Sequence, residues 1–283
     1  MSQNNSVINL GDLSKPATVL IEKISEAVGE IFKPYQIKRI ANAEAEAKVI
    51  YTIADIEVQE LQKRALRRFI KEETIKQKNI EDITAKAIPE LSVTANPREI
   101  ENDWLLHFFD KCKIVSDEDM QKFWAKILAG EANTSGSYSK RAIEVLSLMN
   151  KNDANLFERL CKFSWKIGGD CPLVVECRDS IYNEDGINFS VLTHLDSIGL
   201  LTFNNLTGYI RKGLPKTIIV SYFDKKVKLE FQKEKDNRLS VGQILLSQAG
   251  AELVSVCSSQ PKEGFIDYVK GKWEAGKVVV NIL

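Results

Sequence analysis

The sequence predicts a mainly α-helical protein with a C-terminal α+β unit, and three observations support that fold class. Apolar residues recur at helical spacing over much of residues 1–90. Shorter, aromatic-rich helical segments follow in residues 91–168. Residues 169–283 instead alternate short β-branched runs with turn residues and short helices. We therefore expect three parts: long N-terminal amphipathic helices, a helical middle module and a winged-helix-like α+β domain.

The first predicted helix runs from Ser14 to Phe32. Ser14 can cap it, and Pro16 falls in the first turn, where the missing N–H has no partner to lose. Its polar positions carry Lys and Glu, so the helix is amphipathic. We expect its apolar side to face a partner or a membrane, and that side comprises Leu20, Ile21, Ile24, Val28, Ile31 and Phe32.

Residues 36–78 contain no Gly or Pro and are rich in Ala, Glu, Lys and Arg, a composition typical of a long helix. A continuous helix over this segment would be roughly 65 Å long at 1.5 Å per residue. A rod of that length needs a surface to pack on. Either it folds back on neighbouring helices or it pairs with another chain.

Five cations cluster near the end of this segment. Spacings of three and four residues place them on adjacent rows of one helix, a pattern that suits contacts to phosphates or anionic lipid head groups. The alternative is a solvated face paired with acidic neighbours at compatible spacing, which are Glu57, Glu60, Glu72 and Glu73. The cations are Lys63, Arg64, Arg67, Arg68 and Lys71.

Further elements follow from periodicity and turn residues. In the middle module we expect helices over residues 99–113, from a cap at Ser116 to residue 129, after the linker 133–137, and from Asp153 onward. In the last part we expect strands at 172–175, 187–189 and 277–283, helices at 191–199, 247–257 and 265–274, and a hairpin over 217–231.

Composition narrows the functional classes. Lys plus Arg equals Asp plus Glu at 39 each, so no global field attracts nucleic acid or an acidic surface. The five cysteines form an odd, scattered set, which indicates reduced thiols in a cytoplasm. The first residues do not resemble a secretory signal, and no stretch approaches the roughly 20 apolar residues of a membrane-spanning helix. We expect a cytoplasmic protein without a transmembrane span.

Motifs that carry chemistry are incomplete. The glycine pair at Gly208 and Gly213 lacks the Lys-Ser/Thr of a phosphate-binding loop. Cys171, Cys177 and His194 lack the tight spacing and the fourth ligand of a zinc site. With two histidines in the chain, a Ser/His/Asp or Cys/His arrangement has almost no candidates. We therefore expect no catalytic, cofactor or metal site.

The stretch from Val191 to Leu201, together with residues 246–253, has the pattern of a winged-helix unit, in which a short helix ends in Gly-Leu-Leu before a two-stranded wing. The helix contains His194 and Asp196 but no Lys or Arg to reach phosphates or base edges. The pattern favours a winged helix used for packing.

Several stretches resemble known families. LSKPATVLIEKISEAVG at 13–29, with the Ala/Glu run at 41–48, is similar to the opening of a bacterial and prophage family, domain of unknown function 2806. The helical middle is similar through WLLHFFD at 104–110, FWAKILAGE at 123–131 and SYSKRAIEVL at 137–146. A related similarity runs to the abortive-infection alpha proteins. The resemblance implies a bacterial cytoplasm and a role in defence against phage, and it supplies no catalytic residue.

These observations favour a non-catalytic interaction or effector protein of the abortive-infection type, which acts through helical contacts with a protein partner or with itself. Two alternatives stay open. One is nucleic-acid binding through the basic cluster and the winged-helix-like unit. The other is peripheral membrane binding through the helix over residues 14–32, although the polar face of that helix carries more Glu than Lys.

Overall fold

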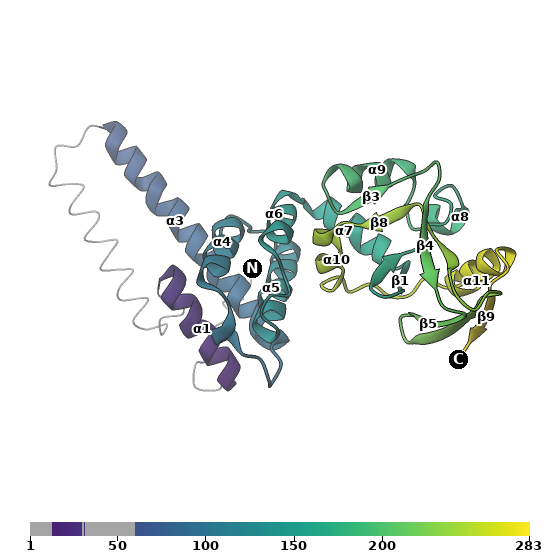
Figure 1. The fold of residues 1–283 in the computed structure, drawn as a ribbon. Coiled ribbons are helices and arrows are strands. Elements are labelled where there is room, and N and C mark those ends of the chain that lie inside the picture. Colours follow the sequence, from purple (N-terminus) through teal and green to yellow (C-terminus); the bar gives the residue numbers. More distant parts are fainter. Residues whose placement is uncertain (1–12, 30, 32–59) are drawn as a thin grey trace. The chain divides into compact units, whose positions relative to one another are not determined.

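A computed structural model describes residues 13–29, 31 and 60–283 (Figure 1). The chain forms two compact units, unit 1 over residues 1–140 and unit 2 over residues 141–283. Unit 1 is helical in its described part, and unit 2 combines helices with antiparallel strands. The mainly α fold with an α+β C-terminal part is therefore confirmed. The expected three-part division, with boundaries after residues 90 and 168, stays a prediction, because compactness does not show which segments fold alone.

Helix α1 (Lys15–Val28) begins as the sequence predicts. The Ser14 side chain accepts a hydrogen bond from Ala17 N, and a proline occupies the first turn. The helix ends at Gly29, whose φ of 96° is costly for other residues. Its buried side packs against the short 3₁₀ helix η3 (Pro97–Glu99) and against helix α4 (Asn102–Cys112).

Helix α3 (Glu60–Ala87) covers the last part of the predicted long helix and continues nine residues beyond its expected end at residue 78. The earlier part of that prediction, residues 36–59, lies outside the described residues. The C-terminal half of α3 packs on helix α5 (Glu118–Asn133) and then leads into the 3₁₀ helix η2 (Ile88–Glu90).

The core of unit 1 is aromatic. Phe108 stacks on Trp104 at 5.1 Å between ring centroids and meets Trp124 edge-on at 5.2 Å. Trp104 Nε1 donates to Tyr138 O at 2.6 Å, so the indole is buried without losing a hydrogen bond. Gly130 lies directly beneath the Tyr138 ring, where any side chain would clash.

Unit 2 opens with helices α6 (Lys140–Leu148, whose first residue closes unit 1) and α7 (Lys151–Cys161). Two expected helix caps are wrong. Helix α5 is capped by Asp117 rather than Ser116, because the carboxylate accepts from both Asp119 N and Met120 N. Helix α7 is capped by Asn150, and Asp153 is the reciprocal residue of that capping box.

A five-stranded antiparallel sheet runs through unit 2 in the order β2-β1-β5-β6-β9. The predicted hairpin is confirmed as β5 and β6, and the final strand as β9. Strands β1 and β2 form a smaller hairpin around the glycine pair 168–169. The strands are β1 (Ser164–Lys166), β2 (Asp170–Pro172), β5 (Thr217–Tyr222), β6 (Lys225–Glu230) and β9 (Val279–Ile282).

Two short ribbons complete the β structure, pairing β3 with β8 and β4 with β7. The expected strand over 187–189 is wrong: Asn188 caps helix α9 there, so these residues serve as a helix start. The expected strand over 172–175 is reduced to the end of β2 and an isolated bridge at Val174. The ribbon strands are β3 (Leu201–Phe203), β4 (Tyr209–Leu214), β7 (Asn237–Gly242) and β8 (Ile244–Leu246).

Three helices of unit 2 lie close to their predicted positions, and they are α9 (Phe189–Ser197), α10 (Gln248–Val254) and α11 (Phe265–Ala275). The short helix α8 (Ser180–Asn183) was not predicted. Helix α11 meets the five-stranded sheet through aromatic rings, with Trp273 against Trp165 at 5.0 Å and Phe265 against Tyr222 at 5.4 Å. This aromatic layer forms much of the second core.

Candidate functional site

The predicted basic cluster lies on the first half of α3. Its members are exposed apart from Lys63, which is half-buried. Arg64, Arg67 and Lys71 follow one another at spacings of three and four residues, so they form a row along one side of the helix. The structure thus brings the predicted cations together on one accessible surface.

Acidic neighbours neutralise little of this cluster. Arg68 Nε lies 3.5 Å from Glu72 Oε1, and both side chains are exposed. Glu73 pairs instead with Lys76, at 2.7 Å. Over residues 60–283, no carboxylate forms an ion pair with the other cluster members, Lys63, Arg64, Arg67 and Lys71. In the described chain, the pairing with acidic neighbours considered from the sequence therefore holds for one cation of the cluster, Arg68.

The opposite side of α3 carries a row of side chains that extends beyond the core. Residues 66, 69, 73, 76, 80, 83 and 87 recur at spacings of three and four, so they share one face, and the ion pair of Glu73 with Lys76 interrupts its apolar side chains. Ile80, Ile83 and Ala87 are buried in unit 1, whereas Leu66 is 41% exposed and Phe69 is 59% exposed. We call Leu66 and Phe69 the apolar extension of α3.

The apolar side of α1 is turned inward. Leu20, Ile24 and Ile31 are buried, Ile21 and Val28 are half-buried, and Phe32 lies outside the described residues. Because η3 and α4 cover this face, membrane binding through it would require the helix to leave unit 1. Within the described ranges, no helix combines the length and apolar content needed to cross a bilayer.

The incomplete motifs have structural positions. Gly208 precedes strand β4, and a side chain there would approach Gly242 O to 2.8 Å, so the glycine permits close contact between two backbones. Glu230 forms an ion pair with Lys228 on β6. His194 Nε2 lies 2.7 Å from Asp153 Oδ1, which links α9 to α7. Cys171 and Cys177 are buried, and burial raises the pKa of both thiols, that of Cys171 to about 11.

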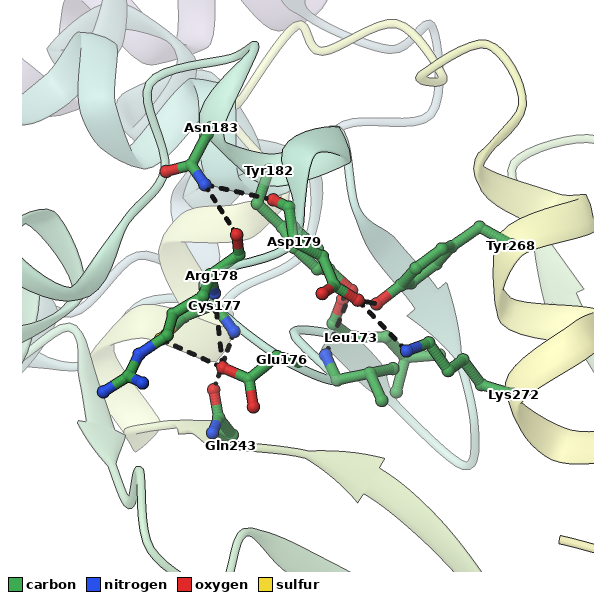
Figure 2. A network of polar contacts seen from close by, with 11 residues as sticks. Leu173, Glu176, Cys177, Arg178, Asp179, Tyr182, Asn183, Gln243, Tyr268 and Lys272 are labelled. Atoms are coloured by element: carbon green, nitrogen blue, oxygen red, sulfur yellow. Dashed lines mark hydrogen bonds and ion pairs between the residues drawn. The ribbon is translucent and has the colours of Figure 1, made fainter. Parts of the chain in front are cut away.

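A network of polar contacts lies in unit 2 around Tyr182 (Figure 2). The buried Tyr182 hydroxyl donates to Leu173 O at 3.0 Å and accepts from Val175 N at 3.0 Å. One phenol therefore satisfies both backbone groups of a bend in the 173–179 loop. Burial raises the pKa of this phenol, which keeps it protonated.

Gln243 holds the same loop from the other side. Its backbone N donates to Val174 O at 2.7 Å, and its side-chain Oε1 accepts from Cys177 N at 2.9 Å. Cys177 Sγ lies 3.9 Å from Glu176 Oε1, and the raised pKa of this thiol makes it a poor nucleophile. The loop is thus clamped by amide contacts rather than arranged for nucleophilic chemistry.

Asp179 connects this loop to α11. The Tyr268 hydroxyl donates to Asp179 Oδ2 at 2.6 Å, and Lys272 Nζ lies 3.1 Å from the same oxygen (Figure 2). The hydrogen bond from Tyr268 and the charge of Lys272 lower the pKa of Asp179. Lys272 also lies 5.1 Å from the centroid of the Tyr268 ring, a cation–π contact.

A second ionic cluster surrounds Asp185, which follows α8. Lys162 Nζ lies 2.5 Å from Asp185 Oδ1, and Lys262 Nζ lies 3.0 Å from Oδ2. Burial opposes ionisation of this carboxyl, but the two lysines outweigh it and lower its pKa. Lys262 also pairs with Glu184 at 2.9 Å. The cluster joins the end of α7 to the segment before α11.

The sequence did not reveal the networks around Tyr182 and Asp185. Their members are up to 89 residues apart, and no local spacing marks them. Both networks hold backbone segments in place. Among the residues that the structure describes, no group of three His, Cys, Asp or Glu side chains is arranged to hold a metal ion. Among the described residues, α3 exposes a basic row and the apolar extension on opposite sides.

The fold defines a class: a mainly helical protein of two units, with an α+β second unit and an exposed surface on α3. The chain belongs to the family described as "Protein of unknown function (DUF2806)", whose model matches residues 63–270. Neither the curated proteins nor the solved structures contain a match to this chain.

Proposed function

We propose that this protein is a non-catalytic interaction protein and that the apolar extension of α3 is its contact with a protein partner. One observation carries the proposal: the face that α3 buries in unit 1 continues outward, past the Glu73–Lys76 ion pair, to exposed Leu66 and Phe69. An aromatic and a leucine at helical spacing form the pattern by which one helix docks on another.

Burial of this face adds measurably to the affinity of a contact. Fully burying a Leu or Phe side chain stabilises a complex by about 1.5–3 kcal/mol, and roughly half of each side chain is still exposed here. The two together can therefore contribute about 2 kcal/mol, a factor of about thirty in affinity. The positive charges of the basic row, on the opposite side of α3, favour a partner that carries acidic groups beside its contact surface.

The test uses the full chain with Leu66→Ser and Phe69→Ser combined, because these changes remove the apolar extension at exposed positions. Tagged protein is captured from bacterial cells with and without phage infection, and the captured proteins are quantified. The double variant should lose the specific partner by at least tenfold. The matched control is Val93→Ser, at a loop position that is 92% exposed, which should keep it.

Equal capture by the double variant and the wild type would contradict this proposal. So would turnover of a nucleotide, nucleic acid or peptide by the purified protein that a single acidic or Cys substitution abolishes.

A role in antiphage defence is supported by the similarity to the abortive-infection alpha proteins. We expect bacteria that express the chain to reduce phage plating, and we expect Leu66→Ser with Phe69→Ser to restore plating. An expressing strain that plates phage as well as an empty strain across a broad phage panel would refute this role.

Nucleic-acid binding is the second candidate, and it is favoured by the cations of the basic cluster that form no ion pair with a carboxylate of residues 60–283. The order of α9, β3 and the β3–β8 ribbon supports a winged-helix-like unit, but α9 has no Lys or Arg. Binding would then take place through contacts between the basic cluster and the phosphates of the nucleic acid, without readout of the bases. Replacing Arg64, Arg67 and Arg68 with Gln should reduce the slope of log K against log salt by about 3. An unchanged slope would dismiss the cluster as a phosphate-binding surface.

A further inference from the structure

The five-stranded sheet of unit 2 ends on strand β9, whose outer edge has no partner strand in the described part of the chain. Strand β9 pairs with β6 alone, from Val279 opposite Glu230 to Ile282 opposite Val227. An unpaired strand edge exposes backbone donors and acceptors that another strand can use. The backbone groups and side chains of β9 determine which strand can pair with this edge.

The direction of the free backbone groups follows from the ladder. Leu283 N donates to Lys226 O at 2.9 Å, and these two residues stand opposite each other in the register. Hydrogen-bonded and non-hydrogen-bonded pairs alternate in an antiparallel ladder, so Asn281 and Val279 also bond toward β6. The N–H and C=O groups of Val280 and Ile282 therefore point away from the sheet.

The side chains leave this edge unprotected. Val279 is 54% exposed, Ile282 is 45% exposed and Leu283 is 67% exposed. Residues 278–283 include no charged side chain and no proline, and the register with β6 shows no bulge. Charges, prolines and bulges are the usual devices that prevent pairing at an edge. Strand β9 is thus open to strand addition.

We infer that β9 pairs antiparallel with β9 of a second copy of this chain, which joins two sheets into one. A two-fold axis perpendicular to the sheet keeps each side chain on its own face. Residues that lie opposite each other must therefore both have even numbers or both have odd numbers, because alternate residues of a strand point to opposite faces. Pairing Val280 with Ile282 of the second copy meets this condition and joins the two residues whose backbone groups are free.

This register is self-complementary. Val279 lies opposite Leu283 of the second copy, so two exposed apolar side chains cover each other. Asn281 lies on the axis opposite its own copy, at a non-hydrogen-bonded position where side chains approach closely. A carboxamide is both donor and acceptor, so two Asn281 side chains can bond to each other. The neutral edge brings no like charges together.

The contact is short, and so we expect a weak dimer that forms at high protein concentration rather than a permanent one. It involves unit 2 only and does not depend on the proposed function of α3.

The experiment measures the mass of the full chain by sedimentation equilibrium over a wide concentration range. Wild type should show a reversible monomer–dimer equilibrium. Asn281→Lys and Asn281→Asp each place like charges on the axis and should weaken the dimer at least about fivefold. An equimolar mixture of the two variants should dimerise again, because opposite charges then face each other. Asn281→Thr, which is neutral and suits a strand, is the matched control and should keep the dimer.

Melting temperatures of all variants should match wild type, since Asn281 is exposed. A wild type that stays monomeric at every concentration overturns the inference. A dimer that neither charged variant weakens, or that the mixture fails to restore, also overturns it.

Discussion

Tyr182 shows how a single buried side chain organises unit 2. Its hydroxyl satisfies one backbone acceptor and one backbone donor of the 173–179 loop. Neither group has an equivalent partner if the hydroxyl is removed, and an orphaned buried polar group costs about 1–3 kcal/mol. The phenol is therefore a structural group in this protein, and its value can be measured directly.

We predict that Tyr182→Phe lowers the free energy of unfolding by about 2 kcal/mol, because the substitution leaves Leu173 O and Val175 N unpaired. Urea denaturation followed by circular dichroism measures the loss. Tyr209→Phe is the control: its hydroxyl bonds to Thr202 Oγ1 at an exposed site, so the expected change is within about 0.5 kcal/mol. Equal losses in both variants would show that the loop is not held by the phenol.

Because of Asp179, we predict that the protein loses stability in acid. Its pKa is lowered in the folded state by Tyr268 and Lys272, so the folded state gains stability above the unfolded pKa of about 3.9. That contribution is lost as pH falls through the lowered folded pKa. Asp179→Asn should therefore flatten the decline of stability below pH about 4, measured as melting temperature against pH. An unchanged acid slope would contradict the pairing of Asp179 with Tyr268 and Lys272.

At the level of elements, Gly242 marks a close approach between two segments of unit 2. It ends strand β7 with a φ of 86°, and a Cβ there would lie 2.4 Å from Val174 O. A side chain at this position faces both backbone strain and a clash with a fixed carbonyl.

We predict that Gly242→Ala destabilises the protein by about 3 kcal/mol or more, from strain and overpacking together. Gly213→Ala separates the two causes, since Gly213 has a φ of 74° with no atom within 4 Å of the added Cβ. It should cost about 1–2 kcal/mol. Chemical denaturation of both variants tests this, and equal losses would mean that the contact with Val174 adds nothing.

Substitutions in helix α1 measure how firmly this helix packs on unit 1. We predict that Leu20→Ala lowers stability by about 2–5 kcal/mol, because Leu20 is buried against its neighbours. Thr18→Ala, two residues earlier at an exposed position, should change stability by less than about 1 kcal/mol. Differential scanning calorimetry measures both. No loss for Leu20→Ala would indicate that α1 is not docked on unit 1, and would revive the membrane hypothesis.

Elements with strong local signals were predictable. The cap at Ser14, the apolar period of α1 and α11, and the β5–β6 hairpin all follow from short-range spacing. The failures have local causes too: Ile187 and Phe189 both favour a strand, but Asn188 between them caps helix α9. The β4–β7 ribbon was missed because its strands are polar and irregular in register.

The candidate site was predictable in part. The basic cluster is visible in the sequence because its members share one helix. The exposure of Leu66 and Phe69 was not, because periodicity shows which residues share a face but not where the packed part of that face ends. Contacts such as Asp179 with Tyr268 join residues 89 positions apart, and one sequence carries no signal for them.

In the whole molecule, the two units have different tasks. Unit 1 anchors one half of α3 and leaves the other half exposed, while the polar networks of unit 2 hold loops and helices together. Balanced total charge leaves recognition to local surfaces. The central claim is that the protein acts by contact through the apolar extension of α3.

Photo-crosslinking in living bacteria tests that claim most directly. A photo-reactive amino acid replaces Phe69 in one strain and Thr74 in another, since both positions are exposed on α3 but Thr74 lies on the side of the basic row. If the apolar extension contacts a partner, we predict a discrete protein adduct from position 69 and none from position 74. Adducts from position 74 alone, or none from position 69 with or without phage infection, would contradict it.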